Sequence, residues 1–138
     1  GYDAAHAMLI IALCHFRRLR GGKDDSMERE LREIIDRALA LDSADALVMA
    51  RIAHGLSFLG KLDQALALAE RSVAINPNLE TPRIQLGEIL IKQGRLDEAL
   101  AQFETSERLA PDGLWSMSRM SIIASNAGRS VRGSLEIS

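Results

Sequence analysis

Apolar residues between positions 45 and 109 recur at spacings of three and four, the period of one buried helix face. In the first such stretch they are Met49, Ile52, Ala53 and Leu56, and in a later one Leu86, Gly87 and Leu90. The stretches are separated by short polar segments that contain glycine or proline. This pattern predicts four amphipathic helices, over residues 45–58, 63–75, 81–92 and 97–109.

The four stretches form two copies of one unit. The segment 59–66 returns as the similar segment 93–100, and Pro77 returns as Pro111, each 34 residues further along the chain. A fixed period of this length indicates a stacked repeat of supersecondary units. We therefore predict two helical hairpins, over residues 46–79 and 80–113.

The turn residues support the hairpins. Gly60 and Gly94 follow the first helix of each unit, where a left-handed turn is accessible to glycine. We expect Asp63 and Asp97 to open the second helices, because a carboxylate suits a helix N-terminus. In the second unit we expect Thr81 to be the N-cap before a proline at the first helical position.

A 34-residue helix-turn-helix unit with small residues at fixed positions resembles the tetratricopeptide repeat (TPR) family. Those small residues are Ala53, Ala65, Gly87 and Ala99. The resemblance implies an all-α fold in which antiparallel helical hairpins stack into a right-handed α-solenoid. The units depart from the family pattern where it has aromatic residues. Leu56 and Leu90 replace the aromatic of the first helix, and Ala69 and then Phe103 occupy the aromatic position of the second helix.

The flanking segments are interpreted as further, divergent parts of one array that covers residues 1–138. Residues 3–44 are predicted to form an N-terminal hairpin: a helix over 3–20, a glycine-containing loop, and a second helix near Ser26. Asp25 and Glu28 are suited to a capping box there, and Ser43 replaces the proline of the later units. Residues 114–127 are expected to form another first helix, and residues 128–138 a frayed or disordered tail. Because the chain begins with Gly1, we interpret it as part of a longer protein.

The composition changes this picture little. Hydrophobic residues make up 47% of the 138 residues and aromatic residues only 4%, as expected for close packing through alanine and leucine. The net charge of -2 gives no electrostatic footprint for nucleic acid. With neither an apolar run long enough for a bilayer nor a recognisable signal peptide, we expect a cytoplasmic protein without membrane contact.

Motifs for catalysis, metal binding or cofactors are weak, so we expect no enzyme activity and no cofactor. The histidines His6, His15 and His54 share no ligand spacing with one another or with Cys14. The sequence Gly21-Gly22-Lys23 lacks the serine or threonine of a phosphate loop and is interpreted as a helix end. Arg17, Arg18, Arg20 and Lys23 form a basic cluster, interpreted as a solvated helix end, with an acidic partner or a phosphate backbone as the alternative.

By the family resemblance, the second, fifth and ninth residues of each unit line the concave surface formed by the first helices. They are Leu47, Ala50, His54, Thr81, Ile84, Glu88, Trp115, Ser118 and Ile122. The lysine, asparagine and arginine with which some family members clamp an acidic chaperone tail are absent from the fifth and ninth positions. This mixed surface suits an amphipathic helix or an extended apolar peptide. The alternative is that these residues pack against a neighbouring helix or a missing repeat.

We also expect His54 and Glu88 to meet in this surface from adjacent first helices, with the imidazole partly charged near neutral pH. The run 12–15, the arginine-rich helix end and the run 37–42 resemble the repeat region of bacterial class III adenylate/guanylate cyclases. That resemblance implies a non-catalytic part of a signalling protein. The sequence thus predicts a protein- or peptide-binding scaffold. The alternative is a self-association module that forms a homodimer through apolar groove or end faces.

Overall fold

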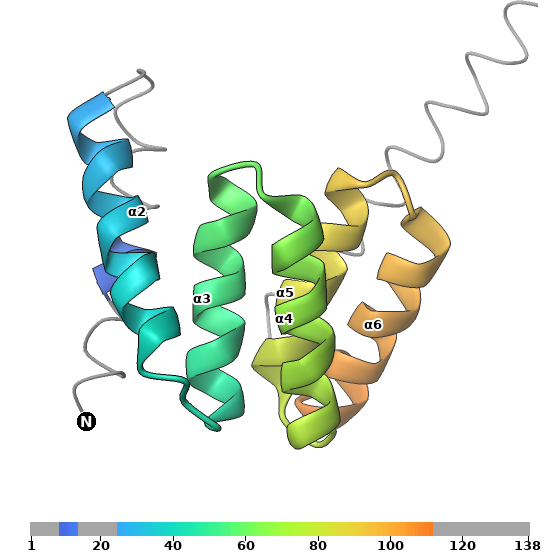
Figure 1. The fold of residues 1–138 in the computed structure, drawn as a ribbon. Helices are drawn as coiled ribbons and strands as arrows, with labels where there is room; N and C mark the ends of the chain where they lie inside the picture. The colour runs from blue at the N-terminus through green and yellow to red at the C-terminus, as the bar shows by residue number, and fades with distance from the viewer. Residues whose placement is uncertain (1–8, 14–24, 112–138) are drawn as a thin grey trace, which may run out of the picture.

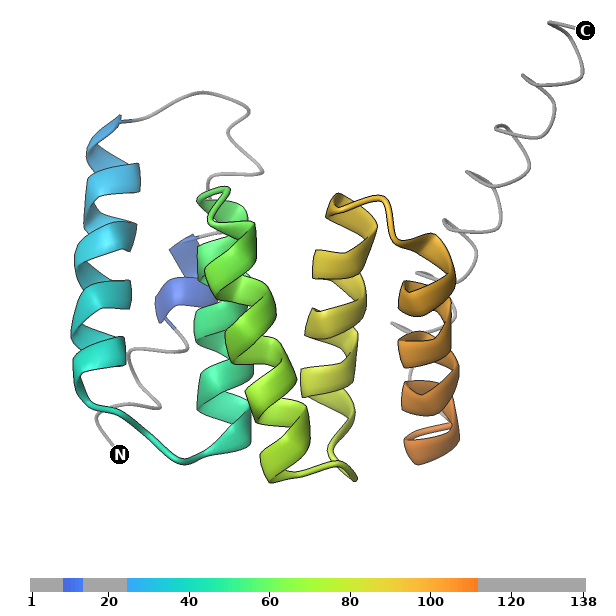
Figure 2. The ribbon, with the colours of Figure 1, turned by 45° about the vertical axis from the view of Figure 1, so that its right-hand side comes forward.

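The computed structural model describes residues 9–13 and 25–111, and all of its regular elements there are helices. Residues 9–13 are helical, and the long helices are α2 (Asp25–Ala40), α3 (Ala46–Phe58), α4 (Leu62–Ile75), α5 (Glu80–Lys92) and α6 (Leu96–Leu109). They stand side by side and are joined by short turns (Figures 1 and 2). The all-α prediction is confirmed, and each of the four central helices begins within one residue of its predicted start.

Several predictions fall outside the described residues. They concern most of the helix over 3–20, the glycine loop after it, the helix over 114–127 and the tail over 128–138. The candidate residues His6, Cys14, His15 and the cluster Arg17, Arg18, Arg20 and Lys23 also lie there, as do Trp115, Ser118 and Ile122.

The two glycine turns have the predicted geometry. Gly60 and Gly94 adopt positive φ angles of 81° and 77°. The N–H groups of Lys61 and Arg95 donate to carbonyls five residues earlier, each at 2.9 Å, which closes the first helix with a Schellman motif. A Cβ at either glycine would meet nothing within 4 Å, so the backbone conformation, and not crowding, requires glycine.

The predicted helix starts need correction. The second helix of the first unit begins at Leu62 with Lys61 as its N-cap, and that cap makes no side-chain hydrogen bond. Asp63 therefore lies inside the first turn, where it acts only through its charge on the helix dipole. Thr81 is likewise inside α5, because Leu79 has the extended conformation of an N-cap. The predicted capping box of Asp25 and Glu28 lies at the edge of the described residues and stays a prediction.

The predicted small residues do bring the helices close together. Ala53, Ala65 and Ala99 are fully buried, and Gly87 is buried beneath the ring of Phe103. A Cβ at Gly87 would lie 2.6 Å from Cζ of Phe103, closer than two non-bonded carbon atoms can approach. The second unit therefore pairs Gly87 with the large ring of Phe103. At the equivalent positions the first unit has two small residues, Ala53 and Ala69, which lie in the same core.

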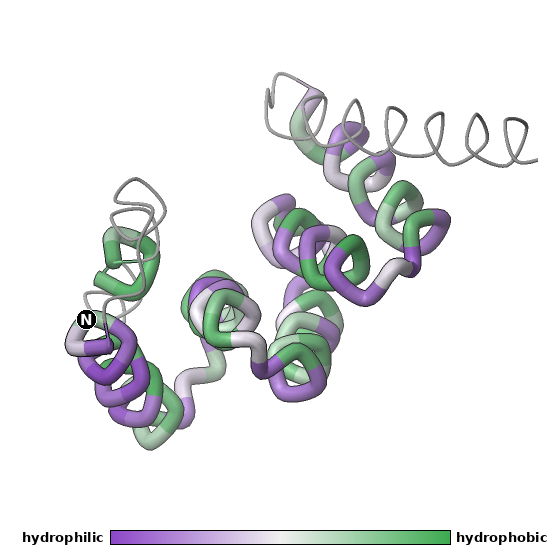
Figure 3. The backbone as a smooth tube through the Cα atoms, turned by 90° about the horizontal axis from the view of Figure 1, so that it is seen from above, coloured by the Kyte–Doolittle hydropathy of each residue, from purple (hydrophilic) through white to green (hydrophobic). Residues whose placement is uncertain are grey.

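Helix α2 stands apart from the rest of the array. It contacts α3 much less extensively than α4 contacts α5, the equivalent pair one unit later. Figure 3 shows α2, the long helix at the left, separated from the cluster of α3, α4 and α5. Asp42 leaves α2 with a left-handed φ of 46°, while the equivalent Asn76 is extended with φ of -139°. A residue before proline is restricted to extended conformations, so the replacement of proline by Ser43 permits this different exit.

Candidate functional site

Three polar side chains meet between the first helices α3 and α5. His54 Nδ1 lies 2.9 Å from Gln85 Oε1 and 3.7 Å from Glu88 Oε2. The side chains of His54 and Glu88 are only 14% and 16% exposed, so they are largely shielded from water. The predicted contact between His54 and Glu88 is confirmed. We call these three residues the first-helix cluster.

The charge of the first-helix cluster depends on the imidazole. With a proton on Nδ1, neutral His54 donates a hydrogen bond to the amide oxygen of Gln85. A second proton makes the contact with Glu88 an ion pair. In either state a carboxylate acceptor, Glu88, lies between two adjacent helices, and it favours a hydrogen-bond donor or a cation in a bound partner.

The other predicted groove residues differ in how accessible they are. Leu47 and Thr81 are half-buried and can still contact a partner. Ala50 is 0% exposed and Ile84 is 8% exposed, so both side chains belong mainly to the packed interior. That burial agrees with the alternative in which these positions pack against neighbouring helices. The surface available on α3 and α5 is therefore more polar than the sequence pattern suggests.

A second polar contact joins the same two helices one turn further on. Lys92 Nζ donates to the Ser57 hydroxyl at 2.7 Å and to the Ser57 carbonyl at 3.4 Å. Neither this pair nor Gln85 was anticipated, because the family pattern selects only the second, fifth and ninth positions. The sequence signal that could have found these contacts is a separation close to the repeat period. The contacts His54–Gln85 and Ser57–Lys92 join residues 31 and 35 apart, on either side of the 34-residue period.

The described residues contain neither a metal-holding group of side chains nor a membrane-spanning helix. Among them, no group of three or more His, Cys, Asp or Glu side chains is arranged to hold a metal ion. No helix within residues 9–13 and 25–111 is both long and apolar enough to cross a bilayer. The arrangement of α3 and α5 provides hydrogen-bonding groups on a helical surface, which is chemistry for recognition.

Comparison with known proteins finds one family model that matches part of the chain. Residues 59–119 match the family model described as tetratricopeptide repeat. No curated protein matches the sequence significantly.

Solved structures share the fold. A TPR protein of Thermus thermophilus is 23% identical, with a TM-score of 0.72 over 89% of this chain and 64% of that one. The second TPR domain of human RPAP3, in complex with an HSP70 peptide, is 20% identical, with a TM-score of 0.62 over 88% and 98%. The first TPR of Spaghetti (RPAP3), bound to an HSP90 peptide, is 16% identical, with a TM-score of 0.65 over 90% and 94%. The chain thus has the fold of a TPR α-solenoid, and its residues 59–119 are similar to the tetratricopeptide repeat.

Proposed function

We propose that this chain is a non-catalytic protein-interaction scaffold that binds a peptide or a helix along its first helices. The observation that carries the proposal is the first-helix cluster, in which His54, Gln85 and Glu88 meet from α3 and α5. Half-buried Leu47 and Thr81 provide apolar and hydroxyl contacts on the same two helices. Support also comes from the RPAP3 and Spaghetti domains, which share the fold and hold chaperone peptides.

The partner we propose differs from an acidic chaperone tail. The fifth and ninth positions hold Ala50, His54, Ile84 and Glu88, and none of them is a lysine, asparagine or arginine. A second carboxylate placed near Glu88 would be repelled, and the repulsion is stronger because the site is shielded from water. The matching partner is an apolar peptide or amphipathic helix that presents an amide donor or a basic side chain to Glu88.

We further propose that the scaffold serves a cytoplasmic bacterial signalling protein of the adenylate cyclase type. The support is the resemblance of the segments 12–15 and 37–42 to the repeat regions of such proteins. The gene of the full-length parent protein tests this context. A parent without a cyclase or signalling-regulator domain would contradict it.

The interaction proposal is tested with a random peptide library displayed on phage. Peptides are selected on the full chain and counter-selected on Glu88→Lys. We expect the counter-selection to leave apolar sequences that carry a basic or amide residue and bind the substituted chain at least about tenfold more weakly. The HSP90 peptide bound by Spaghetti should show no saturable binding. Glu104→Lys, which makes the same charge change at an exposed position of α6, should leave affinity unchanged. Equal binding to both the original chain and Glu88→Lys would contradict the proposal.

The alternative function, self-association, is favoured by one observation. Leu41, Ile75 and Leu109 are exposed, and they occupy the same position at the ends of three successive second helices. If this apolar row pairs two copies, sedimentation equilibrium should show a dimer whose population rises with concentration and falls with Ile75→Glu. A chain that stays monomeric across the accessible concentration range would exclude the alternative.

A further inference from the structure

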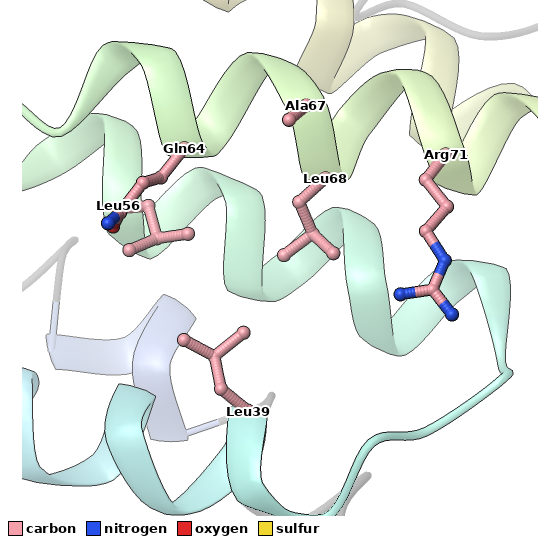
Figure 4. Close-up of a pocket in the computed structure, with 6 residues that line it drawn as sticks. All are labelled: Leu39, Leu56, Gln64, Ala67, Leu68 and Arg71. Carbon is pink, nitrogen blue, oxygen red and sulfur yellow. The ribbon is translucent and has the colours of Figure 1, made fainter.

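A groove lies between the second helices α2 and α4, with α3 as its floor. It encloses about 360 Å³ and is lined by Leu39, Leu56, Gln64, Ala67, Leu68 and Arg71. Figure 4 shows Leu39 of α2 and Leu68 of α4 pointing toward each other across this space, with Leu56 of α3 beside them. A smaller cavity of about 40 Å³ adjoins it near Asp42 and Ser43. We call the larger space the α2–α4 groove.

The groove exists because α2 does not close against α4. Leu39 is 41% exposed, although three other leucine or alanine side chains line the same space. The departure of α2 follows from its left-handed exit at Asp42, which the later unit lacks. Apolar surface that the repeat would normally cover with a neighbouring helix is therefore accessible from outside.

The α4 side of the groove is a single helical stripe. Its residues Gln64, Ala67, Leu68 and Arg71 are spaced three, four and seven positions apart, so they share one face. The equivalent residues of α6 are Glu98, Ala101, Gln102 and Thr105. Leu68 and Arg71 of α4 are thus replaced one unit later by the polar, uncharged residues Gln102 and Thr105. Leu68 and Arg71 are therefore properties of this unit and are not needed for the fold to stack.

The charge at one end of the stripe is uncompensated. Within the described part of the chain, Arg71 makes no hydrogen bond or ion pair, and its side chain is exposed. Asp42 lines the adjoining cavity with Arg71, yet the two are not within salt-bridge distance. A guanidinium binds a carboxylate through two parallel hydrogen bonds, so Arg71 is available to an acidic side chain of a partner.

From this geometry we infer that the α2–α4 groove is a second interaction surface, which binds an amphipathic helix of a partner protein. The partner inserts an aliphatic side chain between Leu39 and Leu68 and places a carboxylate on Arg71. The stripe from Gln64 to Arg71 is roughly 10 Å long at the rise of an α-helix, which matches about two turns of a bound helix. This surface lies on second helices and is independent of the first-helix cluster.

A phage library of helix-forming peptides, selected on the full chain, tests the inference. We expect enriched peptides to carry an aliphatic residue and an Asp or Glu about one helical turn apart. Fluorescence polarisation of a labelled enriched peptide should show at least about tenfold weaker binding to Arg71→Glu and to Leu68→Gln, the residue of the next unit. Replacing the peptide's acidic residue by lysine should restore binding to Arg71→Glu.

Two controls separate this surface from the rest of the molecule. Thr105→Glu places the same charge at the equivalent position of α6 and should leave the affinity unchanged. Glu88→Lys should also leave the affinity of this peptide unchanged. A failure of the α2–α4 groove proposal can therefore be told apart from a failure of the first-helix proposal. The inference is overturned if no acidic aliphatic peptide is enriched, or if Arg71→Glu binds as well as the original chain. Self-association of the chain that Leu68→Gln abolishes would also overturn it, since the occupant would then be a second copy.

Discussion

Phe103→Ala is expected to lower the free energy of unfolding by about 3–5 kcal/mol, the largest effect of any single truncation proposed for this chain. Phe103 is 0% exposed and is the largest fully buried side chain among the described residues. Its ring lies against Gly87, which has no side chain to move into the space that truncation would create. The cavity would therefore remain largely unfilled, and the cost of an unfilled cavity adds to the lost burial of the ring.

Urea denaturation followed by circular dichroism measures this effect. Leu109→Ala, on the same helix but exposed, is the matched control and should change the free energy by less than about 1 kcal/mol. A loss for Phe103→Ala as small as that of the control would show that α6 does not pack on α5 as described. The close contact between Gly87 and Phe103 would then be wrong.

Gly55→Leu is expected to detach the N-terminal hairpin while the later helices remain folded. A Cβ at Gly55 would lie 2.6 Å from Cγ2 of Ile10 and 2.9 Å from Cδ1 of Ile35. Overpacking of this kind costs about 1–3 kcal/mol, more than the roughly 1 kcal/mol that leucine gains over glycine in helix propensity. Among the long helices that the structure describes, α3 is the one that α2 contacts most, so the strain is relieved by opening that interface.

Native-state hydrogen exchange resolves the prediction helix by helix. Amides of α2 should lose protection in Gly55→Leu, while amides of α5 and α6 should keep theirs. Ala101→Leu, at an exposed position of α6, is the control and should alter neither region. Uniform loss of protection along the whole chain would contradict the nearest-neighbour picture, because it would show a single cooperative unit.

The features that could be predicted from the sequence are those fixed by local chemistry. The positive φ angles at Gly60 and Gly94 follow from the turn that each closes, and the helix ends follow from the same residues. Periodicity placed the core positions, including Ala53 and Ala65, because a helix has one buried face. The meeting of His54 with Glu88 also followed from the repeat, which puts equal positions on adjacent helices.

The features that could not be predicted depend on how neighbouring units are rotated and separated. His54 contacts Gln85, about one helical turn before its repeat equivalent Glu88, and no single-helix pattern contains that offset. The burial of Ala50 and Ile84 is likewise a product of packing between helices. The α2–α4 groove depends on the left-handed conformation of Asp42, a residue type that adopts it only in particular surroundings.

The central claim is that the first helices α3 and α5 form a partner-binding surface around the first-helix cluster. The most direct test is a nitrogen-15 NMR titration with the tightest peptide selected on the Leu68→Gln chain, in which the α2–α4 groove is weakened and still repels a basic peptide through Arg71. The largest amide shifts should fall on the residues around His54, Gln85 and Glu88. These shifts should disappear when the titrated chain also carries the substitution Glu88→Lys. Shifts confined to α4 and α6, or shifts unaffected by Glu88→Lys, would contradict the claim.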